Sequence, residues 1–512
     1  MPTRRSVLIG AAGLAACGSE VAKGRGGSED TATATVPTTG STAPGTTATG
    51  STTGLDTGDT AMSHSSPGRK RPNVLIVFPD QLRAMALSGL GETNIRTPVH
   101  DAFLAEAANF TQAVTPGPVC TPARAALWTG WYPYATGTSE NDVPLPEDAP
   151  TIAKELRGLG YTTGYIGKWH LAGNRQRGLI PPNLRGGFTD WFAGHNMGHN
   201  YIGADYWTDG SPYPQRPDPP DLWEPTWQTS LALDYLEERA REPDQPWFMV
   251  LSWGPPHPNG NWPADWTLDV PQSLMSQVDG TSFDFRANVP DWIKEPNRTK
   301  ELGYADPYGA RRFLVGYYAC ILGLDAELQR LLQGLDALGM REDTLVILAS
   351  DHGEMAGSQG RYKKGNWHEE SVRIPLAFRW PGMIAPRALA TPTTLVDVLP
   401  TLRTLCGGDP WEVGHGRDLA GLLVDGTAPS GEWSGSYIAR KEEGPSQRRA
   451  LRTTRWKYGE AIGFPDLNAL YDLEVDPFEL NNLYADDDYA EVREELAAEL
   501  LARRVATLDP SL

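Results

Sequence analysis

Short apolar segments alternate with amphipathic segments along most of the chain, from Pro72 to about residue 425. Continuous apolar runs of strand length occupy residues 73–78, 161–167, 247–253, 344–350 and 374–380. Between these runs, apolar residues recur at helical spacing over residues 101–110, 151–160, 229–242 and 311–338. Because strands that alternate with helices form parallel sheets, the pattern predicts an α/β fold with a mainly parallel central sheet flanked by helices.

The pattern changes beyond about residue 425. Three strand-like segments and one helix-like segment follow, at residues 435–441, 449–461, 469–479 and 489–508. The first three predict short antiparallel strands, and the last predicts an amphipathic helix. We therefore expect a main domain over residues 71–425 and a smaller C-terminal α+β subdomain over residues 426–512 that contains an antiparallel sheet.

The first residues of the chain differ in composition from the rest. Arg4 and Arg5 precede a short apolar run that ends in Leu-Ala-Ala-Cys at Cys17. The run is too short to span a bilayer, so residues 1–17 are predicted to be an export signal. The arginine pair resembles a twin-arginine signal, and Leu-Ala-Ala-Cys resembles a bacterial lipobox, in which Cys17 would be the lipidated first residue of the mature chain. A plain secretory peptide with an incidental cysteine is the alternative.

Residues 18–70 are nearly all Thr, Ser, Gly, Ala and Pro. Such a segment cannot bury apolar surface, so we expect a disordered tether that spans roughly 40 Å as a flexible coil. Together with the signal, the tether predicts an exported protein in the periplasm or at the cell surface of a bacterium. Its only membrane contact would be a lipid anchor.

The 512 residues carry a formal net charge of −19. This charge disfavours binding to nucleic acid, which needs a basic face, and it would repel an anionic ligand at long range. A site for an anion must therefore carry its own local positive charge.

Polar side chains follow four of the predicted strands. In open α/β sheets, ligands bind just beyond the carboxyl ends of the strands, so these side chains are expected to meet at one edge of the sheet. A lone His or Asp after a strand is more often a capping or loop residue than a site residue, but four occurrences in the same topological position favour a site. In chain order they are Asp80 and Gln81, Lys168 and His170, His257, and Asp351 and His352.

The cysteines fall into two groups. Cys120 begins the sequence CTPARAALWTG, in which Pro122 suits the first turn of a helix because its missing N–H is not needed there. Cys120 would lie just before that helix, where free N–H groups and the helix dipole favour an anionic ester or a nucleophile. Cys320 and Cys406 have neighbours typical of core cysteines, and the sequence leaves open whether they form a disulfide.

The segment from Cys120 to Gly130 has the pattern C-x-P-x-R-x4-T-G, which is the signature of the sulfatases. The similarity continues in the expected order through NVLIVFPDQLR, GKWHL, the PHP segment, ASDHGE, KKGNWHEESVRIPLAF and YDLEVDPFELNNL. The chain therefore resembles a type I sulfatase of the alkaline-phosphatase-like superfamily. This resemblance implies an enzyme that hydrolyses sulfate esters.

In type I sulfatases, a separate formylglycine-generating enzyme oxidises the signature cysteine to formylglycine. The resemblance thus implies that Cys120 is a precursor of the working group. The hydrated aldehyde offers two hydroxyl groups, of which one attacks sulfur and the other then drives out sulfate. A serine would be trapped as its sulfate ester, because it has no second oxygen from which to eliminate.

The resemblance also assigns roles to basic residues. Arg124, Lys168 and His170 match positions that contact formylglycine, with His170 as the implied base for sulfate elimination. His257 and Lys364 match a pair that binds the sulfate near the leaving oxygen. Together with a metal, these residues would supply the local positive charge that the acidic chain lacks.

The metal-binding positions of the family correspond to Asp80, Gln81, Asp351 and His352. Oxygen donors suit a hard cation, so the resemblance implies Ca²⁺, with Mg²⁺ as the alternative. Many members have Asp where Gln81 stands and Asn where His352 stands. These departures bear on which metal binds, because His is an unusual ligand for Ca²⁺.

Residues 186–210 are rich in aromatic, His and Asn side chains, which suit contacts with a sugar ring. An ordinary aromatic-lined loop explains the composition equally well. A tethered hydrolase with such a segment indicates a sulfated glycan as the substrate. The candidate substrate contacts are His195, His199, Asn200, Tyr206 and Trp207.

Two other functions are compatible with these motifs. The same signature occurs in formylglycine-dependent phosphoesterases and phosphonate monoester hydrolases, which differ in the anion released. A noncatalytic glycan-binding surface lipoprotein on a decayed sulfatase fold is the alternative from another class, although no motif residue has been lost.

Overall fold

The computed structural model describes residues 71–173, 178–209, 211, 213–219, 221–259, 270–294, 309–429, 435–441 and 447–511. The predicted signal over residues 1–17, including Cys17, and the predicted tether over residues 18–70 lie outside the described residues. Within the described part, no helix combines the length and apolar character needed to cross a membrane.

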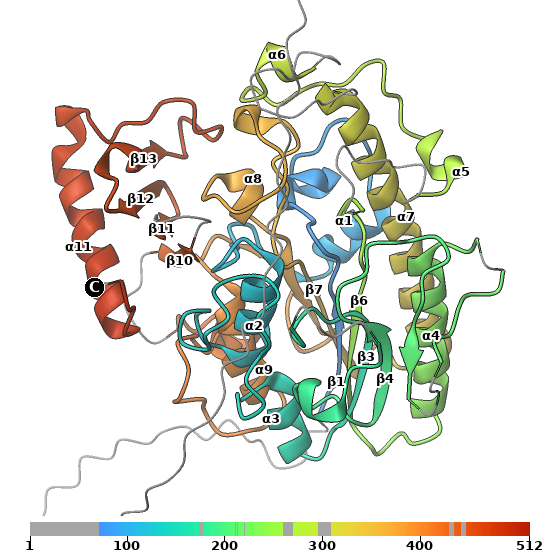
Figure 1. The fold of residues 1–512 in the computed structure, drawn as a ribbon. Coiled ribbons are helices and arrows are strands. Elements are labelled where there is room, and N and C mark those ends of the chain that lie inside the picture. The colour runs from blue at the N-terminus through green and yellow to red at the C-terminus, as the bar shows by residue number, and fades with distance from the viewer. Residues whose placement is uncertain are drawn as a thin grey trace, which may run out of the picture. The chain divides into compact units, whose positions relative to one another are not determined.

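A nine-stranded sheet forms the centre of the molecule, in the order β5-β4-β3-β6-β1-β7-β8-β2-β9 (Figure 1). Its five parallel inner strands are β4 (Trp191–His195), β3 (Thr162–Lys168), β6 (Trp247–Ser252), β1 (Asn73–Val77) and β7 (Thr344–Ala349). The predicted mainly parallel sheet is thus confirmed. The remaining strands are β5 (Trp207–Thr208), β8 (Leu376–Arg379), β2 (Ala108–Phe110) and β9 (Arg387–Leu389).

Helices cover both faces of this sheet (Figure 1). One face packs against α1 (Pro98–Ala105), α4 (Glu224–Arg239) and α7 (Gly309–Ala337). The other face packs against α2 (Cys120–Thr129), α3 (Ile152–Gly158), α9 (Val398–Leu405) and α10 (Ala420–Val424). Short helices α5 (Gln272–Met275), α6 (Asp291–Lys294) and α8 (Glu369–Val372) lie in the connections.

Burial on both faces of the sheet explains why the sequence of β1 is apolar throughout. Leu75 and Val77 belong to the core on the α7 side, whereas Val74 and Ile76 belong to the core on the α2 side. Because both faces are buried, the strand has no polar alternation, and each large aliphatic side chain contributes about 1.5–3 kcal/mol of burial.

The two core cysteines lie on opposite faces of the sheet. Cys320 packs on the α7 side and Cys406 on the α2 side, and both are free thiols. The sheet between them excludes the disulfide that the sequence left open.

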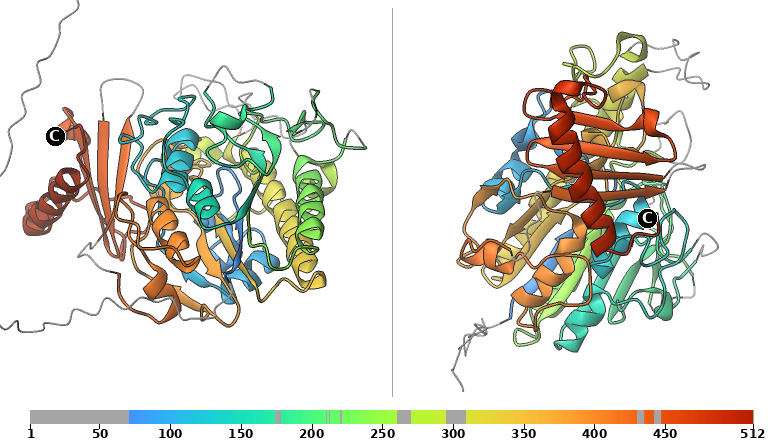
Figure 2. Two further views of the ribbon diagram at one scale, coloured as in Figure 1. Left: turned by 90° about the horizontal axis from the view of Figure 1, so that it is seen from below. Right: turned by 90° about the vertical axis from the view of Figure 1, so that its left-hand side faces the viewer.

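The C-terminal part forms a second sheet, in the antiparallel order β10-β11-β12-β13. Figure 2 shows α11 (Ala490–Ala506) lying across one face of this sheet. Leu496 and Leu500 of the helix pack there with Leu451 and Leu470. The predicted C-terminal subdomain with an antiparallel sheet is confirmed. Its strands are β10 (Gly435–Lys441), β11 (Gln447–Thr453), β12 (Trp456–Ile462) and β13 (Ala469–Asp472).

The structure differs from the predicted elements at several segments. The strand expected over residues 449–461 is divided into β11 and β12, and the strand expected over residues 469–479 ends at Asp472. The helix expected over residues 101–110 occupies Pro98–Ala105, and Ala108–Phe110 form strand β2 instead. These three residues pair with β8 and β9, so edge pairing in the sheet overrides their helical spacing. Residues 186–210 are also more regular than a loop, because they contain β4 and β5.

Candidate active site

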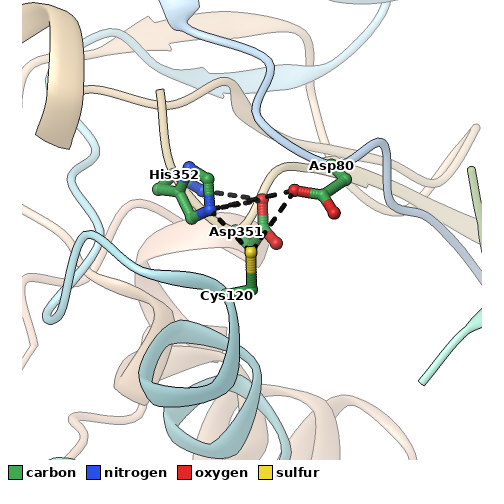
Figure 3. A group of neighbouring side chains, drawn as sticks. All are labelled: Asp80, Cys120, Asp351 and His352. Atoms are coloured by element: carbon green, nitrogen blue, oxygen red, sulfur yellow. Dashed lines mark hydrogen bonds and ion pairs between the residues drawn. The ribbon is translucent and has the colours of Figure 1, made fainter. Parts of the chain in front are cut away.

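The carboxyl ends of β1, β3, β6 and β7 bring the predicted polar residues together. Asp80 follows β1, and its N–H donates to the carbonyl of Trp253 beyond β6 at 2.9 Å. Asp351 and His352 follow β7, and Lys168 ends β3. Figure 3 shows Asp80, Asp351 and His352 around Cys120, with one potential ligand atom of each within 4.8 Å of the others.

Cys120 was expected just before a helix, but it is the first residue of α2 itself, with Val119 as the capping residue, and it is buried. Its Sγ lies 3.2 Å from Nε2 of His352, 3.7 Å from Nζ of Lys168 and 3.8 Å from Oδ1 of Asp80. The residue before it, Val119, is extended and caps the helix with no side-chain hydrogen bond. The thiol therefore stands at a helix N-terminus, where the helix dipole favours negative charge, although the N–H of Thr121 already donates to Asn141 at 3.0 Å.

The surroundings of Cys120 are strongly positive. Burial alone would raise the pKa of its thiol, but the charges of Lys168, Lys364 and His352 lower it well below the ordinary value. The local positive charge that the acidic chain was expected to build is therefore present at this position.

Arg124 lies one turn further along α2 and is completely buried. Its Nε and Nη2 lie 3.1 Å from Oδ2 of Asp351, and Nη2 lies 3.6 Å from Oδ2 of Asp80. Its Nη1 donates to the carbonyl of Lys168 at 2.7 Å and to Oγ of Ser252 at 3.0 Å. The planar guanidinium thereby ties four strand ends, those of β1, β3, β6 and β7, to the helix that bears Cys120.

Lys168 supports the same arrangement from β3. Its Nζ contacts Oδ2 of Asp80 as an ion pair. Burial opposes ionisation of Asp80, but the charges of Lys168 and Arg124 hold the pKa of this carboxyl below its ordinary value. Asp80 is therefore an anion in the folded protein.

The donor set of Asp80, Asp351 and His352 fits a divalent cation. Burial raises the pKa of Asp351, and repulsion from the neighbouring carboxylate of Asp80 raises it further. The His352 Nδ1 lies 3.0 Å from the carbonyl of Gly353, which can only accept, so Nδ1 carries a proton and Nε2 faces the centre. Burial opposes the charged ring, but Asp351 and Cys120 raise the pKa of His352, so Nε2 would become a ligand atom when a cation displaces its proton. A cation between these groups would relieve the repulsion.

Gln81 adjoins this centre in a left-handed backbone conformation, with φ of 68°. Its N–H donates to Oδ1 of Asp351 at 2.9 Å. Its side-chain Oε1 accepts from Nζ of Lys364 at 2.5 Å, and its Nε2 donates to Glu354. Glu354, a buried residue with no predicted role, therefore orients the Gln81 amide.

His257 and Lys364 form a pair at the edge of the centre. The His257 Nδ1 lies 2.6 Å from the carbonyl of Pro258, and its Nε2 lies 2.8 Å from Nζ of Lys364. Burial and the Lys364 charge lower the pKa of His257 to about 4, so its ring is neutral at ordinary pH. His199 stacks on it, with ring centroids 4.0 Å apart.

His170 lies on the loop that follows β3, with a positive φ of 57°. Its Nε2 is 2.9 Å from Oδ1 of Asp142, and its carbonyl accepts from Oγ1 of Thr121 at 2.9 Å. Its buried Nδ1 has no hydrogen-bond partner among the described residues. Asp142 was not predicted, because nothing in the surrounding sequence distinguishes it from other loop carboxylates.

The predicted substrate contacts are divided among three environments. His195, Asn200 and Trp207 line a pocket of about 290 Å³, together with Asp205 and Arg216. The exposed Arg216 and Asp205 form an ion pair at one wall of this pocket.

The other two candidates lie elsewhere. His199 belongs to the His257 stack described above. Tyr206 is completely buried, and its hydroxyl contacts Glu224 and Gln228. Glu224 also contacts Nε2 of His195 at 3.0 Å, so Tyr206 and Glu224 support the pocket from inside.

These features define a class of α/β proteins that hold an anionic ester at the carboxyl edge of a parallel sheet. The family model for sulfatases matches residues 72–408, and the model for the C-terminal region of N-sulphoglucosamine sulphohydrolase matches residues 357–506. An ulvan-active sulfatase of Formosa agariphila is 32% identical over 451 residues, which cover 84% of this chain and 80% of that protein.

Solved structures agree with this relationship. A structure from work on the metabolism of multiple glycosaminoglycans by Bacteroides thetaiotaomicron has a TM-score of 0.74 and 27% identity, covering 86% of this chain and 97% of that one. The phosphonate monoester hydrolase of Agrobacterium radiobacter has a TM-score of 0.66 and 25% identity, covering 86% and 97%. The chain belongs to the sulfatase family, with the alkaline-phosphatase-like fold, and is a sulfuric ester hydrolase.

Proposed function

We propose that this enzyme hydrolyses sulfate esters of sulfated glycans, with formylglycine made from Cys120 and a bound divalent cation. One observation carries the proposal. The Cys120 Sγ lies at a helix N-terminus within 4 Å of Asp80, Lys168 and His352, so a nucleophile made at this position would stand between a carboxylate-based cation site and a buried ammonium group.

Cys120 is the precursor in this account, and a formylglycine-generating enzyme is the partner that converts it. The hydrated aldehyde supplies two hydroxyl groups on one carbon, which is the chemistry that a thiol or serine lacks. Arg124 and Lys168 hold the oxygens of this group and offset their charge. His170, whose buried Nδ1 has no partner among the described residues, takes the proton when sulfate is eliminated.

The cation is held by Asp80, Asp351 and His352, with Gln81 beside them. Carboxylate and amide oxygens favour Ca²⁺, and Mg²⁺ is the alternative. A bound cation supplies positive charge where a sulfate oxygen and the nucleophile would meet. The raised pKa of Asp351, caused by burial and by the charge of Asp80, supports its presence, although Arg124, Lys168 and His352 already lie within 4 Å of the two carboxylates.

His257 and Lys364 act on the sulfate ester in this proposal. His257 is neutral and accepts the Lys364 hydrogen bond, so it orients the Lys364 amine near the site without pairing with it as an anion. Lys364 therefore binds a sulfate oxygen, and His257 directs it. In this proposal, the pair stabilises the negative charge that develops on the leaving oxygen of the ester.

The pocket lined by His195, Asn200 and Trp207 is the proposed place for the sugar ring. An indole face, an amide and an imidazole are the groups that stack on and hydrogen-bond to a sugar. The ulvan-active relative and the glycosaminoglycan-related structure support a sulfated polysaccharide as the substrate class.

The enzyme is also proposed to be exported and lipid-anchored through Cys17, after conversion of Cys120 in the cytoplasm. The twin-arginine signal supports this order of events, since that route carries folded proteins. A variant with Arg4 and Arg5 replaced by Lys should stay in the cytoplasm, and Cys17→Ala should be exported but recovered without the membrane. Normal export of the double lysine variant would contradict the proposal.

The reaction is tested by anion chromatography after incubation with an aryl sulfate, the matched aryl phosphate and phosphonate ester, and a panel of sulfated glycans. Release of sulfate from at least one glycan is expected. Phosphate or phosphonate release that exceeds sulfate release would favour the second candidate, a formylglycine-dependent phosphonate monoester hydrolase like the Agrobacterium radiobacter relative. Glycan binding with no anion released by formylglycine-containing protein would favour a noncatalytic glycan-binding lipoprotein.

A further inference from the structure

A second group of basic side chains lines a pocket that shares no residue with the centre around Cys120. The pocket has a volume of about 460 Å³ and lies where the end of β2 meets the β11–β12 turn and the end of β13. Its walls are Thr111, Gln112, Arg373, Arg452, Thr454, Arg455, Leu473 and Glu474.

Arg373 carries the most informative charge in this pocket. Its Nε and Nη2 donate to the carbonyl of Thr111 at 3.0 and 2.6 Å. Among the described residues it forms no ion pair with a carboxylate. Burial lowers the pKa of its guanidinium, and the charges of Arg452 and Arg286 lower it further against the opposing effect of Glu369. Arg373 is thus a buried guanidinium whose donors meet a backbone carbonyl, with no carboxylate directly paired to it among the described residues.

The other two arginines are held in place from behind. Arg452 is buried and pairs with Glu369 at 3.1 Å, and its Nη1 donates to the carbonyl of Thr453 at 2.8 Å and to the side chain of Gln112 in the pocket wall. Arg455 is half exposed and binds Asp472 through Nε and Nη2. Neither Glu369 nor Asp472 lines the pocket, so these carboxylates fix the guanidinium groups without filling the space in front of them.

The charges of the lining residues are unbalanced. Three guanidinium groups face one carboxylate, that of Glu474, whose side chain is mostly exposed. The amide of Gln112 and the hydroxyl groups of Thr111 and Thr454 add hydrogen-bonding groups. Planar guanidinium groups with neighbouring hydroxyl and amide donors are the usual partners of tetrahedral oxyanions.

We propose that this pocket binds a sulfate group, carried by a unit of the sulfated chain other than the one being hydrolysed. The sulfate ligand follows from the pocket itself, and only the glycan as its carrier rests on the proposed function. On an acidic protein, such a subsite would offset the long-range repulsion of a polyanionic substrate.

Thr454 offers a substitution that leaves the arginines intact. It is exposed on the turn between β11 and β12 and lines the pocket. Thr454→Glu would place a carboxylate against the bound sulfate, and Thr454→Gln is the neutral control of the same length. Michaelis constants are measured with a sulfated polysaccharide and with an aryl sulfate, which carries a single sulfate group and so has none to spare for the pocket.

With Thr454→Glu, the KM for the polysaccharide should rise at least about fivefold, whereas Thr454→Gln should change it less than about twofold. The KM for the aryl sulfate should stay unchanged in both variants, which also controls for folding. Equal KM values for the polysaccharide in the two variants would overturn the proposal that the pocket binds a sulfate group of the chain.

Crystals soaked in selenate test the pocket independently of turnover. An anomalous peak beside Arg373 in the unmutated protein, absent in Thr454→Glu, is the expected result. If the peak disappears in Thr454→Glu while both variants keep equal KM values for the polysaccharide, the pocket binds free sulfate and does not bind the sulfated chain. No peak and no change in KM would refute the subsite altogether. If the unmutated protein turned over none of the substrates, the proposed function would be refuted, and the selenate result would still stand.

Discussion

The Nζ of Lys364 lies 2.8 Å from Nε2 of His257, although the two residues are 107 positions apart in the chain. His257 donates from Nδ1 to the carbonyl of Pro258 and is neutral, so it accepts the lysine hydrogen bond. Lys364 also donates to Gln81. The ammonium group is therefore directed by two acceptors toward the centre that contains Cys120, and it lowers the pKa of that thiol.

Lys364→Met should reduce kcat/KM for an aryl sulfate by about 10²–10³-fold, because a preorganised charge at the sulfate is lost. Lys363→Met is the matched control, since Lys363 is the exposed neighbour of Lys364. Steady-state kinetics of both variants give the comparison. Near-normal kinetics for Lys364→Met would show that its charge does not act on the substrate.

Arg124→Lys should lose at least about 100-fold in kcat/KM. Lysine cannot reproduce the planar fork that contacts Asp351, Ser252 and the Lys168 carbonyl at once. We also expect the free energy of unfolding to fall by about 1–3 kcal/mol, since buried acceptors lose their donors. Arg157→Lys, at an exposed surface pair, should change neither quantity. Equal kinetics for the two variants would contradict the role assigned to Arg124.

Removal of divalent cations should abolish turnover and lower the unfolding temperature by several degrees. Asp80 and Asp351 are buried beside each other, and a cation that binds only the folded protein stabilises it by about 2.7 kcal/mol at 100 times its dissociation constant. Calorimetry with chelator, followed by addition of Ca²⁺ or Mg²⁺, measures both effects and identifies the metal. An unfolding temperature indifferent to chelator and to both cations would argue against the site. Asp351→Asn should remove the cation-dependent shift.

His415 should make stability depend on pH between about 6.5 and 4. Its Nδ1 accepts from the N–H of Tyr132 at 3.0 Å, and burial lowers the pKa of the ring to about 4. The fold favours the neutral ring, so its stabilisation is complete above the unfolded pKa of about 6.5 and is lost as pH falls toward 4.

Denaturant unfolding at pH 6.5 and at pH 4.5 measures this effect. The unmutated protein should lose on the order of 1 kcal/mol more than His415→Gln over this interval, with partial exposure of the ring limiting the size. The same pH dependence in both proteins would assign the effect to other groups.

The sequence predicted the central sheet well because its strands are buried on both faces. Continuous apolar runs such as residues 73–78 have no other common explanation, and the polar residues that end them were correctly expected at one edge. Strand β2 was missed, since Ala108–Phe110 are short and continue a helical spacing, and only pairing with β8 and β9 makes them a strand.

The neighbours of the predicted site residues were harder to predict. Glu354 follows the DHG sequence but acts through Gln81, which is 273 positions away. Asp142 contacts His170 from a loop with no recognisable pattern. Tyr206 was predicted to be a substrate contact because its segment is rich in aromatic, His and Asn residues, yet it is buried. Such contacts depend on how loops that are distant in the chain fold over the edge of the sheet, and no periodic pattern in the sequence predicts them.

The central claim is that Cys120, once converted to formylglycine, carries out sulfate-ester hydrolysis at this site. The most direct test measures sulfate release from one substrate by the unmutated protein and by Cys120→Ala, with the formylglycine content of each preparation determined from the peptide mass. We predict release in proportion to the formylglycine content and a loss of at least about 10³-fold in Cys120→Ala. Full turnover by Cys120→Ala, or by unmutated protein without formylglycine, would contradict the claim.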